Sequence, residues 1–130
     1  MNFNYKKRKL NNSTSTNDEE ASSFNIITKG DHIYFYEDVD SPQILELISQ
    51  IKDLQFELAQ SSNPIIHLHL YSYGGDAHLG FSMYDFIKNL PIKTYTYIDG
   101  MIASAATFIY LAGEHRFMTR NSTVLIHQLS

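Results

Sequence analysis

Two segments of this chain have the same layout: an apolar strand-like stretch, a glycine-bearing turn, and then a helix-like stretch. Residues 65–71 (IIHLHLY) alternate along a strand, and the turn SYGGDAHLG leads into a predicted helix over 77–89. Residues 92–98 (IKTYTYI) form a second strand pattern, followed after Gly100 by a predicted helix over 102–112. Strands that alternate with helices pair in parallel, with the helices packed over the sheet. We therefore expect an α/β fold.

The remaining segments extend this pattern at both ends. The stretch FNIITKGDHIYFYED predicts two short strands around a turn at 29–31, with ordered structure from Phe24 onward. A helix is expected over 42–60, because Pro42 suits the first helical position and apolar residues then recur every three or four positions. HRFMT and TVLIHQ predict two final strands around a turn at 120–122. The expected order is β-β-α-β-α-β-α-β-β.

The composition fits one globular domain of 130 residues, with 43% hydrophobic and 18% charged residues. No stretch approaches the ~20 apolar residues that span a bilayer. The basic N-terminus, MNFNYKKRKL, has no apolar core behind it as a secretory signal would have. The chain has no cysteine, which excludes disulfides and a thiol nucleophile. We expect an intracellular, cytoplasmic protein that does not bind a membrane.

The charges are unevenly distributed. The basic run KKRK is followed by the polar run NNSTSTN, so residues 1–23 are expected to form a disordered polar tail, although such a basic run can also be a nuclear-import signal. From Ala21 onward, acidic residues outnumber basic ones by eleven to six. The domain expected over 24–130 is therefore a poor surface for nucleic acids.

The second strand-to-helix junction, DGMIASAA, surrounds one hydroxyl with small side chains. Ser104 lies between Ala103 and Ala105 at the predicted start of a helix. Small neighbours let a substrate backbone approach, and backbone N–H groups such as those of Gly75 and Ala105 can stabilise an oxyanion, so Ser104 is a candidate nucleophile. It can equally be a small residue that caps a tightly packed helix.

A serine nucleophile needs a base, and His127 in NSTVLIHQ is the candidate. Its apolar neighbours are also typical of a buried strand histidine that bonds to the backbone. A serine and a histidine 23 positions apart are common. The spacing alone leaves both interpretations open.

Four motifs follow one another in the second half of the chain: SYGG, YD, GMIAS and NSTVLIHQ. In this order they resemble the proteolytic subunit of the Clp protease, which has a Ser-Pro-Gly-Gly turn, a helix ending near YD, a Gly-x-x-x-Ser junction and an NS…IHQ strand. The resemblance covers residues from about Phe24 to Gln128 and is strongest from Leu70 onward. It implies a crotonase-like (Clp protease) ββα spiral fold.

The same resemblance implies a serine endopeptidase that hydrolyses peptide bonds of unfolded proteins. Ser104 matches the nucleophile and His127 the base. The backbones of Gly75 and Ala105 match the oxyanion hole.

Two features depart from the family pattern. Tyr73 replaces the proline of the turn, which frees one backbone angle in the oxyanion loop. The sequence ends at Ser130, before the family's triad aspartate and the helix and strand that join its two rings, so a C-terminally truncated fold is expected. Asp76, Asp85 and Asp99 lie upstream, and none is assigned to the triad.

Without a matched aspartate we expect very weak peptidase activity, because loss of the orienting carboxylate costs about four orders of magnitude in rate. Two alternatives stay open. One is a catalytically impaired Clp-like interaction subunit or fragment. The other is a crotonase-like acyl-CoA enzyme, which would use the same oxyanion hole without a serine nucleophile.

The resemblance also implies partners. It implies unfolded polypeptide substrates, a homo-oligomeric ring and an ATP-dependent unfoldase, to which any use of ATP would belong. Apolar helix residues that such a ring would bury are expected at Phe81, Tyr84, Phe86, Phe108 and Tyr110.

No cofactor or metal is expected. His67 and His69 lie on one face of a strand, as metal ligands can. The Clp family has large aromatic or aliphatic residues there, and the sequence indicates no third ligand, so packing is the favoured interpretation. The turn GGDAHLG lacks the Lys and Ser/Thr of a phosphate-binding loop.

Overall fold

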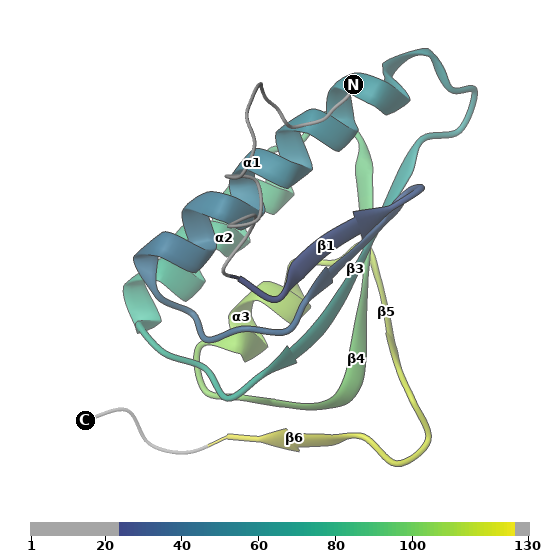
Figure 1. Ribbon diagram of the computed structural model, residues 1–130. Coiled ribbons are helices and arrows are strands. Elements are labelled where there is room, and N and C mark those ends of the chain that lie inside the picture. Colours follow the sequence, from purple (N-terminus) through teal and green to yellow (C-terminus); the bar gives the residue numbers. More distant parts are fainter. Residues whose placement is uncertain (1–23, 127–130) are drawn as a thin grey trace, which may run out of the picture.

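The computed structural model describes residues 24–126 (Figure 1). The predicted tail, residues 1–23, and His127 lie outside the described residues. The elements are, in chain order, β1 (Ile26–Lys29), β2 (His32–Phe35), α1 (Ser41–Glu57), the 3-10 helix η2 (Leu58–Gln60), β3 (Ile65–Ser72), α2 (Ala77–Lys88), β4 (Lys93–Ala103), α3 (Ala106–Leu111), β5 (His115–Met118) and β6 (Thr123–Leu125).

The strands of the described region form one sheet. Their order is β1-β2-β3-β4-β5, and β6 also pairs with β4. β1 and β2 form an antiparallel hairpin, whereas the pairs β2–β3, β3–β4, β4–β5 and β4–β6 are parallel. Parallel strands need crossover connections, which α1, α2 and α3 supply in turn. The predicted α/β class and order of elements are confirmed.

The three helices cover one face of the sheet (Figure 1). The opposite face carries no helix within residues 24–126, and we call it the open face. Strand side chains that point toward the helices are almost completely buried, and they pack with apolar helix residues into one core: Ile33, Phe35, Ile66, Leu68, Leu70, Ile98, Leu47, Ile51, Met83 and Ile109. Burial of each such side chain contributes about 1.5–3 kcal/mol.

The helix boundaries follow their local sequence signals. α1 starts at Ser41 with proline in its first turn, and the predicted span 42–60 ends in the tighter η2. The Asp76 carboxylate caps α2 by accepting the N–H groups of His78 and Leu79 at 2.8 and 3.2 Å. No helix within the described range is long and apolar enough to cross a lipid bilayer.

The largest difference from the sequence prediction lies after β4. The helix predicted over 102–112 begins only at Ala106, because β4 continues through Ala103. Residues 101–103 pair with β6, and β3 lies on the other side of β4. Strand partners on both sides outweigh the helix propensity of the alanines.

A bulge bends β4 in its middle. Leu70 of β3 pairs with Ile98 of β4. Two residues later, Ser72 pairs with Ile102, so β4 uses four residues where β3 uses two. The bulge divides β4, because its first half pairs with β5 and its last three residues pair with β6.

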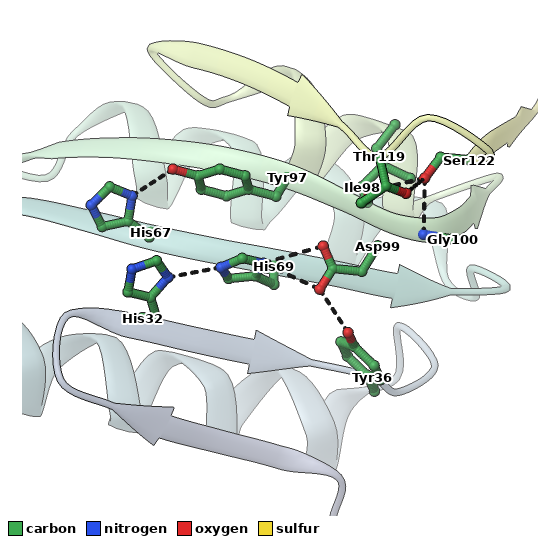
Figure 2. Close-up of polar contacts among 10 residues, drawn as sticks. All are labelled: His32, Tyr36, His67, His69, Tyr97, Ile98, Asp99, Gly100, Thr119 and Ser122. Atoms are coloured by element: carbon green, nitrogen blue, oxygen red, sulfur yellow. Dashed lines mark hydrogen bonds and ion pairs between the residues drawn. The ribbon is translucent and has the colours of Figure 1, made fainter.

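Ser122 holds this bulge from the neighbouring loop (Figure 2). Gly100, in the bulge, has a φ of +100° and donates its N–H to the Ser122 hydroxyl at 2.9 Å. That hydroxyl donates in turn to the Ile98 carbonyl at 3.1 Å, and the Thr119 hydroxyl contacts it as well. One side chain therefore joins both sides of the bulge.

We expect Ser122→Ala to lower the free energy of unfolding by about 1 kcal/mol, because the Gly100 N–H loses its acceptor and the Ile98 carbonyl keeps only the Thr119 N–H. Urea unfolding followed by circular dichroism measures the change. Ser61→Ala, in the exposed loop after η2, is the matched control and should change stability by less than about 0.5 kcal/mol. A Ser122 variant as stable as the control would contradict the role of this hydroxyl.

Candidate active site

Ser104 lies in a tight turn between β4 and α3. Its φ is +56°, and among residues 24–126 no other non-glycine residue has a positive φ. This left-handed conformation costs about 1–2 kcal/mol, so surrounding structure must hold it. The sequence predicted Ser104 at a helix start. The structure places it in the strained turn just before the helix, with Ala105 as the N-cap of α3.

Three backbone hydrogen bonds hold this turn. The Ser104 N–H donates to the Leu125 carbonyl of β6 at 3.1 Å. The Thr107 N–H donates to the Ser104 carbonyl at 2.9 Å, and the Phe108 N–H donates to the Ala105 carbonyl at 3.1 Å. Ser104 is partly exposed, and its hydroxyl forms no hydrogen bond within the described part of the chain. The hydroxyl is therefore available to a substrate.

The turn after β3 packs bare backbone against the Ser104 turn. A Cβ atom at Gly74 would lie 2.7 Å from the Ser104 Cβ and 2.6 Å from the Ala103 carbonyl oxygen, so no side chain fits there. The φ of Gly74, +98°, also favours glycine. On the other side, the Val39 N–H donates to the Gly74 carbonyl and the Asp76 N–H donates to the Val39 carbonyl, both at 2.8 Å. The glycine turn is fixed between residue 39 and Ser104.

The amides of Gly75 and Ala105 lie in these two adjoining turns. Neither donates a hydrogen bond to another residue of the range 24–126. Unpaired N–H groups next to a nucleophile can donate to the oxyanion that forms from a bound substrate. The structure thus brings together the turns that contain Ser104, Gly75 and Ala105.

Packing explains the alanines beside Ser104. Ala105 and Ala106 are completely buried. Gly80 of α2 comes so close that a Cβ atom there would lie 2.8 Å from the Ala105 carbonyl oxygen. The small side chains let α2 and α3 approach each other.

His127, the predicted base, lies outside the described residues. The strand that precedes it, β6, pairs with β4 through Ala103 and Leu125. The Leu125 carbonyl also accepts the Ser104 N–H. The described part of this segment therefore runs directly beside the serine turn.

The upstream aspartates have other surroundings. Asp76 caps α2, and Asp85 is exposed on the same helix. Asp99 accepts the Tyr36 hydroxyl at 2.6 Å and contacts His69 Nδ1 at 3.1 Å (Figure 2). Burial and this bond to Asp99 raise the pKa of Tyr36 above its ordinary value, so the phenol stays protonated and remains the donor.

Sequence reasoning missed a polar cluster on the open face. His32, His67 and His69 lie side by side there, next to Tyr97 and Asp99 (Figure 2). The His-x-His pair was visible in the sequence. His32 was not, because it reaches the pair only through the β2–β3 register, in which it lies opposite His67.

The sequence model of the Clp protease family matches residues 15–130 of this chain. The chain belongs to the Clp protease family. Among curated proteins, the ATP-dependent Clp protease proteolytic subunit 2 of Treponema denticola is 39% identical over 80 residues, a match that covers 60% of this chain and 40% of the relative. The chain therefore spans less than half the length of this Clp relative.

Solved Clp structures have the same fold. ClpP1 from Listeria monocytogenes matches with a TM-score of 0.69 and 27% identity, over 77% of this chain and 58% of that chain. The ClpP protease catalytic domain from Plasmodium falciparum matches with a TM-score of 0.64 and 26% identity, over 74% of this chain and 53% of that one. The resemblance found in the motifs and the predicted Clp-type α/β fold are confirmed.

The contact between the two turns of this Clp-family chain can be tested by substitution. Gly74→Ala should lower the free energy of unfolding by about 2–4 kcal/mol, because its methyl group would overlap the Ala103 carbonyl and the backbone is left-handed. Gly30→Ala is the matched control, since its φ is +59° but nothing lies within 4 Å, and it should cost about 1 kcal/mol. Denaturant unfolding measures both. Equal losses would contradict the close approach of the turns.

Proposed function

We propose that this chain carries the nucleophile and the oxyanion-binding turns of a Clp-type serine endopeptidase, which hydrolyses peptide bonds of unfolded proteins. The observation that carries the proposal is the left-handed Ser104, held against the Gly74 turn with a free hydroxyl. A strained nucleophile in a sharp strand-to-helix turn recurs in serine hydrolases. Membership of the Clp protease family supports the same reaction.

In the proposed reaction, the Ser104 Oγ attacks the carbonyl carbon of a peptide bond and His127 takes the hydroxyl proton. The carbonyl oxygen becomes an oxyanion, which the N–H groups of Gly75 and Ala105 stabilise. Ala105 fits this role because the amide after the nucleophile commonly donates in such turns. His127 then protonates the leaving amine, and water hydrolyses the acyl-enzyme.

We assign no aspartate of the described residues to the triad, because Asp76 and Asp99 have structural partners. A histidine without an orienting carboxylate is not held in one tautomer, and the rate then falls by about four orders of magnitude. Slow peptide cleavage by the 130-residue chain is the expected result. A carboxylate from a neighbouring subunit would raise the rate.

The proposed enzyme works as a homo-oligomeric ring with an ATP-dependent unfoldase that delivers unfolded polypeptides. The name of the Treponema denticola relative, which describes an ATP-dependent protease, supports this partner. Such a complex belongs inside the cell, where ATP is available. Leu45, Phe56 and Phe81 are exposed on α1 and α2, and burial of these side chains by a neighbouring subunit would favour a ring.

The residues that the sequence predicts for a ring surface differ in their exposure. Phe81 is exposed as expected, and its ring centroid lies 4.4 Å from that of Phe108. Three of the other predicted residues instead pack against the core: Tyr84, Phe86 and Tyr110. These three bury apolar surface within the subunit.

Labelling with a fluorophosphonate, which reacts with activated serines, tests the nucleophile. Intact mass spectrometry should show one adduct on the unmodified chain and none on Ser104→Ala. The exposed control Ser61→Ala should be labelled at the same rate as the unmodified chain. His127→Ala should slow labelling by at least about 100-fold, the range of a general base.

Equal labelling of Ser104→Ala would remove Ser104 from the site. An unmodified chain that does not react would contradict the peptidase proposal and favour the catalytically impaired interaction subunit. The acyl-CoA alternative predicts an unreactive Ser104 together with saturable binding of an acyl-CoA.

A further inference from the structure

We propose that Asp31, His32 and His67 form a binding site for a divalent transition-metal ion, with Zn²⁺ as the preferred occupant. The site lies at the start of β2 on the open face. It is separate from the Ser104 turn and has no part in the proposed peptidase chemistry. A carboxylate and two imidazoles are ligands that Zn²⁺ accepts readily, whereas Mg²⁺ and Ca²⁺ prefer oxygen ligands alone.

The backbone places these three residues together. In the parallel β2–β3 register His32 lies opposite His67, and the two imidazoles stack with centroids 4.4 Å apart and planes 12° apart (Figure 2). Asp31 immediately precedes His32, and its carbonyl accepts the His67 N–H at 2.9 Å. The turn that carries the carboxylate is thereby fastened to the strand that carries the second imidazole.

The distances between the ligand atoms suit a metal. His32 Nε2 lies 3.6 Å from one Asp31 carboxylate oxygen, and His67 Nε2 lies 3.8 Å from the other. One ligand atom from each residue lies within 4.8 Å of the others. Tetrahedral Zn²⁺ with bonds of about 2.0–2.2 Å needs ligand atoms about 3.3–3.5 Å apart. A contraction of a few tenths of an ångström up to about 1.5 Å closes the site. The exposed Asp31 side chain can move its carboxylate, and a rotation of the stacked imidazoles must bring their two lone pairs together.

A chain of hydrogen bonds fixes the tautomer of His32. Asp99 is an acceptor, so His69 donates to it from Nδ1, at 3.1 Å from the nearer oxygen. The His69 Nε2 then accepts from His32 Nδ1, which lies 2.8 Å away (Figure 2). This assignment leaves a lone pair on His32 Nε2, the atom that faces Asp31. Metal-bound histidines are commonly held through their other nitrogen in this way.

His67 is held in the same manner. Its Nδ1 lies 2.6 Å from the Tyr97 hydroxyl (Figure 2). When Nδ1 donates to that oxygen, the lone pair is on Nε2, which faces Asp31. In this arrangement Nδ1 of each imidazole is hydrogen-bonded, and Nε2, the nitrogen that faces Asp31, is available to a metal. Packing accounts for the stacking of the rings but not for this shared orientation toward a carboxylate.

The site is open to solvent on one side. The side chains of Asp31 and His32 are 47% and 38% exposed, whereas that of His67 is 19% exposed. An ion can enter without unfolding the sheet. Three protein ligands leave a fourth position for water, as in zinc sites that exchange a ligand.

Isothermal titration of the chelator-treated chain with Zn²⁺ tests the proposal. One equivalent should bind, and His32→Asn or His67→Asn should weaken affinity by at least about 100-fold. Tyr97→Phe removes only the hydrogen bond to His67 Nδ1, and His69→Gln removes the one to His32 Nδ1 together with two ring contacts. Each should weaken the affinity by about 10-fold. His78→Asn, an exposed histidine on α2, is the matched control and should leave affinity unchanged.

Co²⁺ provides a second readout, because a low-symmetry site with bound imidazoles gives visible absorption bands much stronger than those of aqueous Co²⁺. These bands should disappear in His32→Asn and persist in His78→Asn. If His67→Asn fails to fold, Asp31→Asn on the exposed turn gives the same test. Zn²⁺ affinity that is equal in the unmodified chain, His32→Asn and Asp31→Asn would overturn the proposal. The proposal would also be overturned if the cluster bound no metal and only shared a proton between Asp31 and a histidine.

Discussion

The bulge in β4 is the constraint on which the serine turn depends. Without the bulge, β4 would pair with β5 along its whole length and not with β6. The Ser104 N–H would then lose its acceptor, the Leu125 carbonyl of β6. The insertion adds an even number of residues, so Ile98 and Ile102 both still point toward the helices. An odd insertion would turn Ile102 to the open face and expose it. The bulge thus changes the partner of β4 without changing its buried side.

The turns that contain Gly74 and Ser104 form one site because their backbones pack closely together. Gly74 has no Cβ, and its backbone occupies the space beside Ser104 that a side chain would need. The contact works in both directions, because the same closeness that excludes a side chain at residue 74 supports the left-handed conformation at residue 104. Strain in the nucleophile turn is therefore balanced by ordinary packing around it.

Local patterns are sufficient to predict most of the fold. Periodicity and turn residues predict the β1–β2 hairpin, α1, β3 and α2, because each of these elements depends mainly on its own segment. The four motifs in the second half of the chain indicate the Clp family by their order. The start of α3 could not be predicted, because β6 decides it from a distant part of the chain. His32 was missed for the same reason, since only strand pairing brings it to His67. The buried packing of Ala105 likewise depends on Gly80 of a different helix.

Within residues 24–126, aromatic and imidazole rings rather than a helix cover the open face. Tyr34, His69, Tyr97 and Phe117 come from four successive strands, and the strand registers align them. Adjacent rings in this series are 4.4, 4.5 and 5.0 Å apart and nearly parallel. The stack leaves the His69 side chain only 14% exposed. It also fixes the ring that connects Asp99 to His32, because rotation of His69 would break two ring contacts at once.

The short strand β6 has a consequence for the timescale of the serine turn. All three of its residues are exposed, and within the described residues it pairs only with β4. Exposed edge segments with few buried contacts open locally at a low free energy, long before the core does. Each opening removes the acceptor of the Ser104 N–H and allows that backbone to relax from its left-handed conformation. Opening of β6 therefore removes one support of the strained geometry, while the Gly74 contact and the hydrogen bonds from Thr107 and Phe108 remain.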